Sequence, residues 1–363
     1  MGKFVFYFLM LFFSLYFFAC RNVSRVEEEQ VQADSIKYRI VYYIHGDGSY
    51  LYHDEEGNDI QADERMVSQA ISVAEELPNS EVFIFHQKPK KHFLFFFPLK
   101  DGEFYYYRNG QLIENVTYKS NPSLLNLDIE AAFFREYAAY VPDLPGRAVK
   151  NFFLFYGHEI PESDGRGYNS SCPEKPFSIE NLSKSLALFR SMSQMGGSKF
   201  DFLLLSTCYN GTPMVISELA PNASYIMASP EYLHLSYISS EYLKKLPEID
   251  KSGDLHAYLK NFAESAFSSL KSYTRTMITI TLYDLEKVKG FLDNFDFAKA
   301  TGGDREIRDE TGSLRDNTGC IDCSTEMNFN TKAAMQGVDL FYSPPQFGKY
   351  KGKLTHSGWG CPK

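Results

Sequence analysis

Phe202-Leu203-Leu204-Leu205-Ser206-Thr207-Cys208 is an apolar run that ends in a thiol, and the polar turn at 209–211 follows it directly. Continuous apolar runs of this length are typical of strands buried on both faces, as in a parallel sheet covered by helices. Fifty residues upstream, the run at 152–158 repeats the pattern and ends in His158. Open α/β sheets form their crevices at the carboxyl ends of strands, so we expect Cys208 and His158 to meet at one sheet edge.

This pairing of a thiol and an imidazole indicates an enzyme. A cysteine attacks as its thiolate, and a nearby imidazole can remove or return the proton. The alternative is that Cys208 is a small buried hydrophobic residue and His158 an ordinary loop residue, because cysteine is among the most buried residue types. Both residues lie just past strand ends with polar or glycine neighbours, which favours the catalytic interpretation.

The rest of the chain alternates between strand and helix patterns. The residue patterns predict strands at 38–44, 81–86, 92–97 and 225–228, helices near 66–77 and at 127–140, 179–192 and 213–219, and a hairpin turn at Asn109-Gly110. Strands that alternate with helices predict an α/β fold with a mostly parallel sheet and helices on both faces. The hairpin should extend this sheet as an antiparallel pair at one edge.

Composition supports a large folded core and excludes one class of partner. The chain has 363 residues, of which 44% are hydrophobic and 16% aromatic. Its net charge is −9, and no face rich in lysine and arginine stands out. Nucleic acid is therefore not expected as a partner.

The N-terminus has the pattern of a targeting segment. Lys3 precedes an apolar run at 4–19 that is too short to span a membrane as a helix and stops at Cys20. The segment 17–20 resembles a bacterial lipoprotein signal, which predicts residues 1–20 as a signal ending at a lipidated Cys20; ordinary cleavage or an uncleaved anchor are the alternatives. Residues 21–36 are polar and predict a flexible tether, so the protein should be exported and held at the cell envelope by its lipid.

Of the four remaining cysteines, one lies within the core that we place at 37–300 and three follow it. Cys172, Cys320, Cys323 and Cys361 form an even set, and disulfides persist in exported proteins. Cys320 and Cys323 could instead form half of a zinc site or a redox pair, but no second pair of ligands follows. In the C-terminal extension, 301–363, the acidic residues Asp304, Glu306, Asp309 and Glu310 could bind calcium or form a solvated surface. No cofactor is otherwise expected.

The sequence also resembles the clostripain-like cysteine peptidases, which are related to caspases and gingipains. The resemblance is carried by the segments 200–208, 218–220 and 225–231, and by 39–48, 278–285 and 337–344, and it covers about residues 38 to 345. It implies a caspase-like fold and an endopeptidase that acts on proteins or peptides.

The resemblance also implies a role for each site residue. Cys208 would be the nucleophile, His158 would protonate the leaving amine, and the amides of Glu159 and Cys208 would bind the oxyanion. Two residues differ from the family, because Glu159 replaces a glycine and Ser206 replaces an aspartate associated with binding a basic side chain.

The substrate pocket would then be built from Ser206, Ser229 and Glu231. Glu231 could restore the negative charge that Ser206 lacks, or it could be a solvated loop acid.

Three alternatives remain at this stage. His45 also follows an apolar strand and competes with His158. The chain could be an inactive relative that serves as a binding module on the surface, or a structural envelope protein. The last interpretation would be favoured if His158 and Cys208 were far apart.

Overall fold

The structure is a computed structural model. It describes residues 36–46, 51–53, 59–89, 92–93, 97–121, 123–139, 149–169, 173, 175–192, 197–233, 238–293, 336–348, 351, 356 and 358–359. The expected signal, Cys20, most of the tether, the other four cysteines and the acidic cluster lie outside these residues. Among the described residues, no helix combines the length and the apolar character that crossing a membrane requires.

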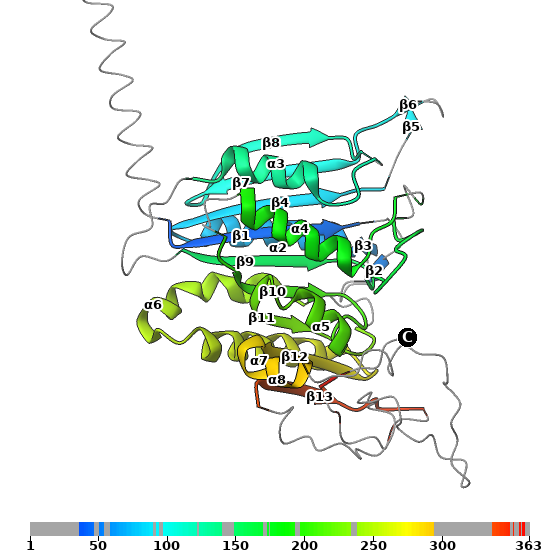
Figure 1. The fold of residues 1–363 in the computed structure, drawn as a ribbon, viewed down its shortest axis with the longest axis vertical. Coiled ribbons are helices and arrows are strands. Elements are labelled where there is room, and N and C mark those ends of the chain that lie inside the picture. The colour runs from blue at the N-terminus through cyan, green and yellow to red at the C-terminus, as the bar shows by residue number, and fades with distance from the viewer. Residues whose placement is uncertain are drawn as a thin grey trace, which may run out of the picture.

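The centre of the described fold is a nine-stranded sheet with the order β13-β12-β11-β10-β9-β1-β4-β7-β8 (Figure 1). Its strands are β1 (Tyr38–His45), β4 (Ser80–Gln87), β7 (Gly102–Arg108), β8 (Gln111–Tyr118), β9 (Lys150–Tyr156), β10 (Phe200–Ser206), β11 (Ala223–Ala228), β12 (Ile278–Asp284) and β13 (Val338–Ser343). The five strands from β11 to β4 are parallel, and antiparallel strands extend the sheet at both edges. The expected mostly parallel α/β sheet is confirmed, with an antiparallel pair added at each end rather than at one.

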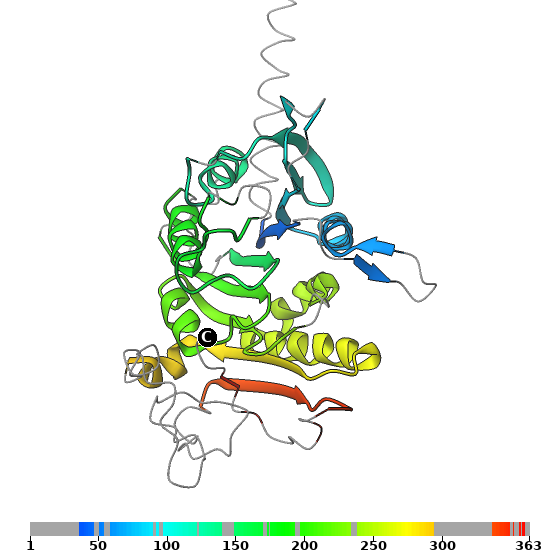
Figure 2. The same cartoon turned by 90° about the vertical axis from the view of Figure 1, so that its right-hand side faces the viewer.

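The central strands are almost entirely buried because helices cover both faces of the sheet: β1 and β4 are buried along their whole length, and β9 and β10 at all but one residue each. One face packs against α3 (Asp128–Tyr137), α4 (Ile179–Met192), α5 (Pro213–Leu219) and α8 (Leu285–Asp293). The other packs against α2 (Ala62–Glu76), the 3-10 helix η1 (Ser240–Glu248), α6 (Ile249–Ser252) and α7 (Leu255–Tyr273). Figure 2 shows these two helical layers on either side of the sheet. This burial explains why the strand sequences are continuously apolar.

Local sequence signals account for several of these elements. Asn109 and Gly110 both have positive φ, 49° and 81°, as the tight turn between β7 and β8 requires. The single strand expected at 92–97 is instead two short antiparallel strands, β5 (His92–Phe93) and β6 (Phe97–Pro98). A second small ladder joins β2 (Leu51–His53) to β3 (Asp59–Gln61).

The sheet includes residues from the expected C-terminal extension. β13 pairs with β12 along its length and lies beyond residue 300. Trp359 is buried in the hydrophobic core on the α8 face of the sheet. The C-terminal part of the chain therefore contributes to the same core as the central strands.

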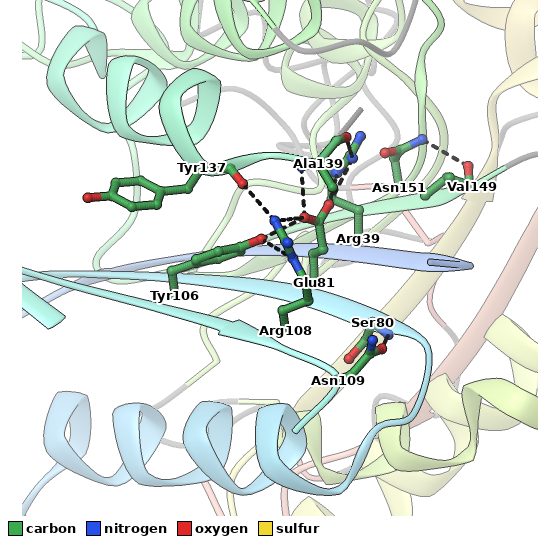
Figure 3. Close-up of polar contacts among 10 residues, drawn as sticks. All are labelled: Arg39, Ser80, Glu81, Tyr106, Arg108, Asn109, Tyr137, Ala139, Val149 and Asn151. Carbon is green, nitrogen blue, oxygen red and sulfur yellow. Dashed lines mark hydrogen bonds and ion pairs between the residues drawn. The ribbon is translucent and has the colours of Figure 1, made fainter. Parts of the chain in front are cut away.

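A buried ion pair holds the amino ends of β1 and β4 together. Arg39 donates to Glu81 through Nε (3.0 Å) and Nη2 (2.8 Å), and the two residues are 3% and 0% exposed. The second carboxylate oxygen of Glu81 accepts from the Tyr106 hydroxyl (2.7 Å) and the Ala139 amide (2.8 Å), and Arg108 lies 3.6 Å away (Figure 3). The carboxylate of Glu81, on β4, thus bonds to residues of β1 and β7 and to the backbone that follows α3.

Candidate active site

His158 and Cys208 lie at equivalent positions at the ends of neighbouring strands. Tyr156 is the register partner of Ser206 in the parallel β9–β10 ladder, and each catalytic candidate follows two residues later. The Gly157 amide continues the contact by donating to the Ser206 carbonyl (3.4 Å). Adjacent strands are separated by about 4.8 Å, and both side chains are half-buried rather than sealed. The two residues therefore share one edge of the sheet and remain accessible to a substrate.

The sulfur of Cys208 accepts a hydrogen bond from the backbone. Cys208 is a thiol rather than part of a disulfide, and the Leu233 amide donates to its Sγ (3.4 Å). An N–H group aimed at sulfur favours the charged thiolate over the thiol. The next residue, Tyr209, has a φ of 54°, a left-handed conformation that costs a non-glycine residue about 1–3 kcal/mol. The chain thus turns sharply directly after the nucleophile candidate.

Asn210 binds the His158 loop to the Cys208 loop. Its Oδ1 accepts from the Ile160 amide (3.0 Å), and its Nδ2 donates to the Ile160 carbonyl (2.9 Å). The Thr207 hydroxyl donates to the same Oδ1 (2.6 Å). Asn210 is buried and satisfies both backbone groups of Ile160, so it fixes the spacing of the two loops. Asn210 lies in the polar turn expected at 209–211, but the sequence gives no signal of its contact with Ile160.

Two glycines of the site lie in tightly packed surroundings. A Cβ at Gly157 would lie 3.1 Å from the His45 Cβ and 3.2 Å from the Tyr168 hydroxyl. A Cβ at Gly211 would lie 2.5 Å from the Pro230 nitrogen. The loop after β9 therefore packs closely on the end of β1, and the loop after β10 packs directly on the backbone of the loop after β11.

The three substrate-binding candidates differ in their surroundings. Ser206 is buried and accepts a hydrogen bond from the Ile238 amide (2.8 Å). Ser229 is also buried, donates to the Glu231 carbonyl (2.8 Å) and accepts from the Glu231 amide (3.2 Å). The hydroxyls of both serines thus hold the loops of the site. The side chain of Glu231 is 19% exposed and lies beyond the end of β11, which flanks β10 on the side opposite β9.

Acidic groups gather around Tyr209. Burial raises the pKa of Tyr209, and the charges of Glu231, Cys208 and Glu159 raise it further. These charges therefore act on the Tyr209 phenol in the same direction as its burial.

A cavity of about 240 Å³ opens beside Tyr209. It is lined by Glu159, Pro161, Glu162, Ser163, Tyr209, Asn210 and Thr212. Burial raises the pKa of Glu162, although a hydrogen bond from the Thr212 hydroxyl (2.8 Å) opposes this and the charge of Glu159 adds to it. Two carboxylates, those of Glu159 and Glu162, therefore line this cavity in the loop that follows β9.

His45 is not adjacent to Cys208. It ends β1, and β9 lies between β1 and β10 in the sheet. Its ring is buried against Tyr168, with ring centres 4.9 Å apart, and Tyr43 lies beyond at 6.5 Å. In the described ranges, no group of three His, Cys, Asp or Glu side chains could hold a metal ion.

Comparisons with known proteins identify the fold. No model of a protein family matches the sequence, and no curated protein sequence matches it. The X-ray structure of an inactive zymogen C11 protease from Parabacteroides distasonis matches with a TM-score of 0.51 at 14% identity, over 89% of this chain and 90% of that chain. That of a secreted C11 cysteine protease from Bacteroides thetaiotaomicron gives a TM-score of 0.49 at 13% identity, over 73% and 70%. The chain has the caspase-like α/β fold of the C11, or clostripain-like, proteases.

Proposed function

We propose that this chain is a clostripain-like cysteine endopeptidase in which Cys208 is the nucleophile and His158 the general acid. The observation that carries the proposal is the pairing of Tyr156 with Ser206, because it puts the imidazole and the thiol two residues beyond matched strand ends. The amide bonded to Sγ and the half-buried state of both side chains support it. A caspase-like fold raises the expectation without assigning a reaction.

The chemistry follows from these two groups. The Cys208 thiolate attacks the scissile carbonyl carbon, and the amides of Glu159 and Cys208 bind the resulting oxyanion. The intermediate collapses by breaking the C–N bond, and His158 gives its proton to the departing amine. Water then attacks the thioester, His158 takes a proton from that water, and the thiolate leaves with the release of the acid product.

The acidic surroundings favour a basic side chain on the acyl side of the cut. His158 flanks Cys208 from β9 and Glu231 lies on the β11 side, so an amine that leaves toward His158 directs the acyl side chain toward Glu231. Glu231 would pair with the arginine or lysine of the substrate, while Ser206 and Ser229 shape the pocket by holding its loops.

Covalent capture tests the assignment directly. A labelled peptidyl acyloxymethyl ketone that ends in arginine should modify the protein, and peptide mapping should place the adduct on Cys208. The Cys208→Ala protein should remain unlabelled while keeping its melting temperature. A native protein that is folded but not labelled would instead favour the binding-module alternative.

Export and lipid anchoring are part of the same proposal. The support is the apolar run at 4–19 that ends at Cys20. Mass spectrometry of the mature protein should find an acylated Cys20 as its first residue, and Cys20→Ser should release the protein from membranes. A mature N-terminus elsewhere would contradict the anchor and leave the peptidase assignment intact.

A further inference from the structure

Three residues near the C-terminus, His356, Gly358 and Trp359, lie against the edge of the sheet that is formed by β12 and β13. Trp359 is buried, and its ring lies 4.6 Å from that of Tyr283 and 5.1 Å from that of Phe291. Gly358 has a φ of 83°, and a Cβ there would lie 2.9 Å from Cγ1 of Val338. This part of the chain therefore occupies a defined position against β12, β13 and α8.

Tyr283 links these residues to the turn after the nucleophile. Its hydroxyl is 3.0 Å from the Gly211 carbonyl and is also hydrogen-bonded to the Gly358 carbonyl. Gly211 in turn donates its amide to the Ser229 carbonyl (2.9 Å). One buried phenol thus bridges the C-terminal residues and the Cys208 loop.

His356 makes a second link, and its geometry defines the proton positions on the ring. The Gly358 amide donates to Nδ1 (3.0 Å), so the neutral ring carries its proton on Nε2. Nε2 lies 3.3 Å from Oε1 of Glu231 and donates to it. The His356 side chain is fully buried and its ring lies 5.2 Å from that of Tyr342. The imidazole is therefore a fixed donor aimed at one carboxylate.

The segment that carries Glu231 also contacts the sulfur. The Glu231 carbonyl accepts from the Tyr209 amide (3.1 Å), directly after Cys208. Two residues past Glu231, the Leu233 amide donates to Sγ of Cys208 (3.4 Å). The orientation of the Glu231 carboxylate and the position of the thiol thus depend on the same short loop.

We infer that His356 is a positioning residue that holds the Glu231 carboxylate in place to receive a basic side chain on the acyl side of the cut. A glutamate side chain that is free to rotate loses conformational entropy when it binds a basic side chain. A hydrogen bond from a fixed donor restricts the glutamate before binding, so less entropy is lost in the binding step. This inference rests on the proposed function, because it assigns a role in substrate recognition to the same site.

Two substitutions of His356 separate its two hydrogen bonds. In His356→Gln the side-chain amide reaches the position of Nε2 and can still donate to Glu231. In His356→Asn the side chain reaches only the position of Nδ1, so it keeps the contact with the Gly358 amide and loses the one with Glu231. Two fluorescent peptides that carry either arginine or its neutral isostere citrulline at the acyl position report the charge preference.

The experiment measures both peptides in hydrolysis by the active mature protein and in binding to its Cys208→Ala form. The parent protein should prefer arginine, and His356→Asn should lower the arginine-to-citrulline ratio about tenfold, as expected for one hydrogen bond to a charged group. The loss should appear in KM rather than kcat. His356→Gln should keep the ratio, and Glu231→Gln should abolish the preference.

The outcomes distinguish the inference from the function on which it rests. An unchanged ratio in His356→Asn, an equal loss for both peptides, or no arginine preference in the parent would overturn the role of His356. If neither peptide is hydrolysed but the Cys208→Ala protein binds arginine with a preference that depends on His356, the peptidase assignment fails, and His356 retains only a positioning role in the binding of a basic side chain.

Discussion

Cys208→Ala is expected to lower kcat/KM for a peptide substrate on the order of 10⁶-fold, as removal of a covalent nucleophile does in other hydrolases. His158→Gln should cost about 10²- to 10⁴-fold, because it removes proton transfer to the leaving amine and keeps the thiol. The two groups act on the same bond, so the double variant should be no slower than Cys208→Ala alone. Initial rates with a fluorogenic peptide measure all three.

His256→Gln is the matched control for His158→Gln. His256 is a partly exposed histidine on α7 whose Nε2 bonds to Asp339 (2.7 Å), and with Ala223 and Asp201 it lines a cavity at the amino ends of β10 and β11. This cavity lies at the sheet edge opposite Cys208, so the control should keep its activity. Equal losses in the two histidine variants, with both proteins folded, would contradict the role of His158.

Glu81→Leu is expected to lower the stability of the fold strongly. It leaves the Arg39 guanidinium buried without its carboxylate, and breaking a buried pair in this way costs about 3–5 kcal/mol of unfolding free energy. The Tyr106 hydroxyl and the Ala139 amide also lose their acceptor (Figure 3). The melting temperature should fall on the order of 10 °C, measured by circular dichroism.

Two further variants test the origin of this loss. Arg39→Met combined with Glu81→Leu removes both charges and should recover much of the stability, because a well-packed apolar pair often replaces a buried ion pair without loss. Lys184→Ala removes one partner of the exposed Glu180–Lys184 pair on α4 (2.6 Å) and should leave the melting temperature nearly unchanged. If Glu81→Leu melts like Lys184→Ala, the buried pair does not stabilise the fold.

The parts of this fold that sequence predicted depend on local patterns. The apolar runs that precede His158 and Cys208 indicated buried parallel strands, and Asn109-Gly110 indicated the hairpin. Helix α7 was not predicted, although its signals are present: Asp254 caps its first turn by accepting from the Ala257 amide (2.9 Å), and buried residues recur at helical spacing along it.

The parts that sequence did not predict depend on contacts between distant residues. Asn210 bonds to Ile160 across 50 positions, and His356 meets Glu231 across 125. No periodicity or spacing in the sequence marks such pairs, because they form only when strand order brings the loops together. The short hydroxyls of Ser206 and Ser229 likewise acquire their backbone partners only in the folded chain.

The buried Arg39–Glu81 pair and the catalytic candidates lie at opposite ends of the parallel strands of one sheet. Arg39 and Glu81 are the second residues of β1 and β4, whereas His158 and Cys208 follow the last residues of β9 and β10. The ion pair that supports the sheet and the loops that carry the candidate site therefore lie at separate ends of the fold. Loop sequences at the carboxyl edge can diversify, by natural drift or by engineering, while the amino edge preserves the architecture that carries them.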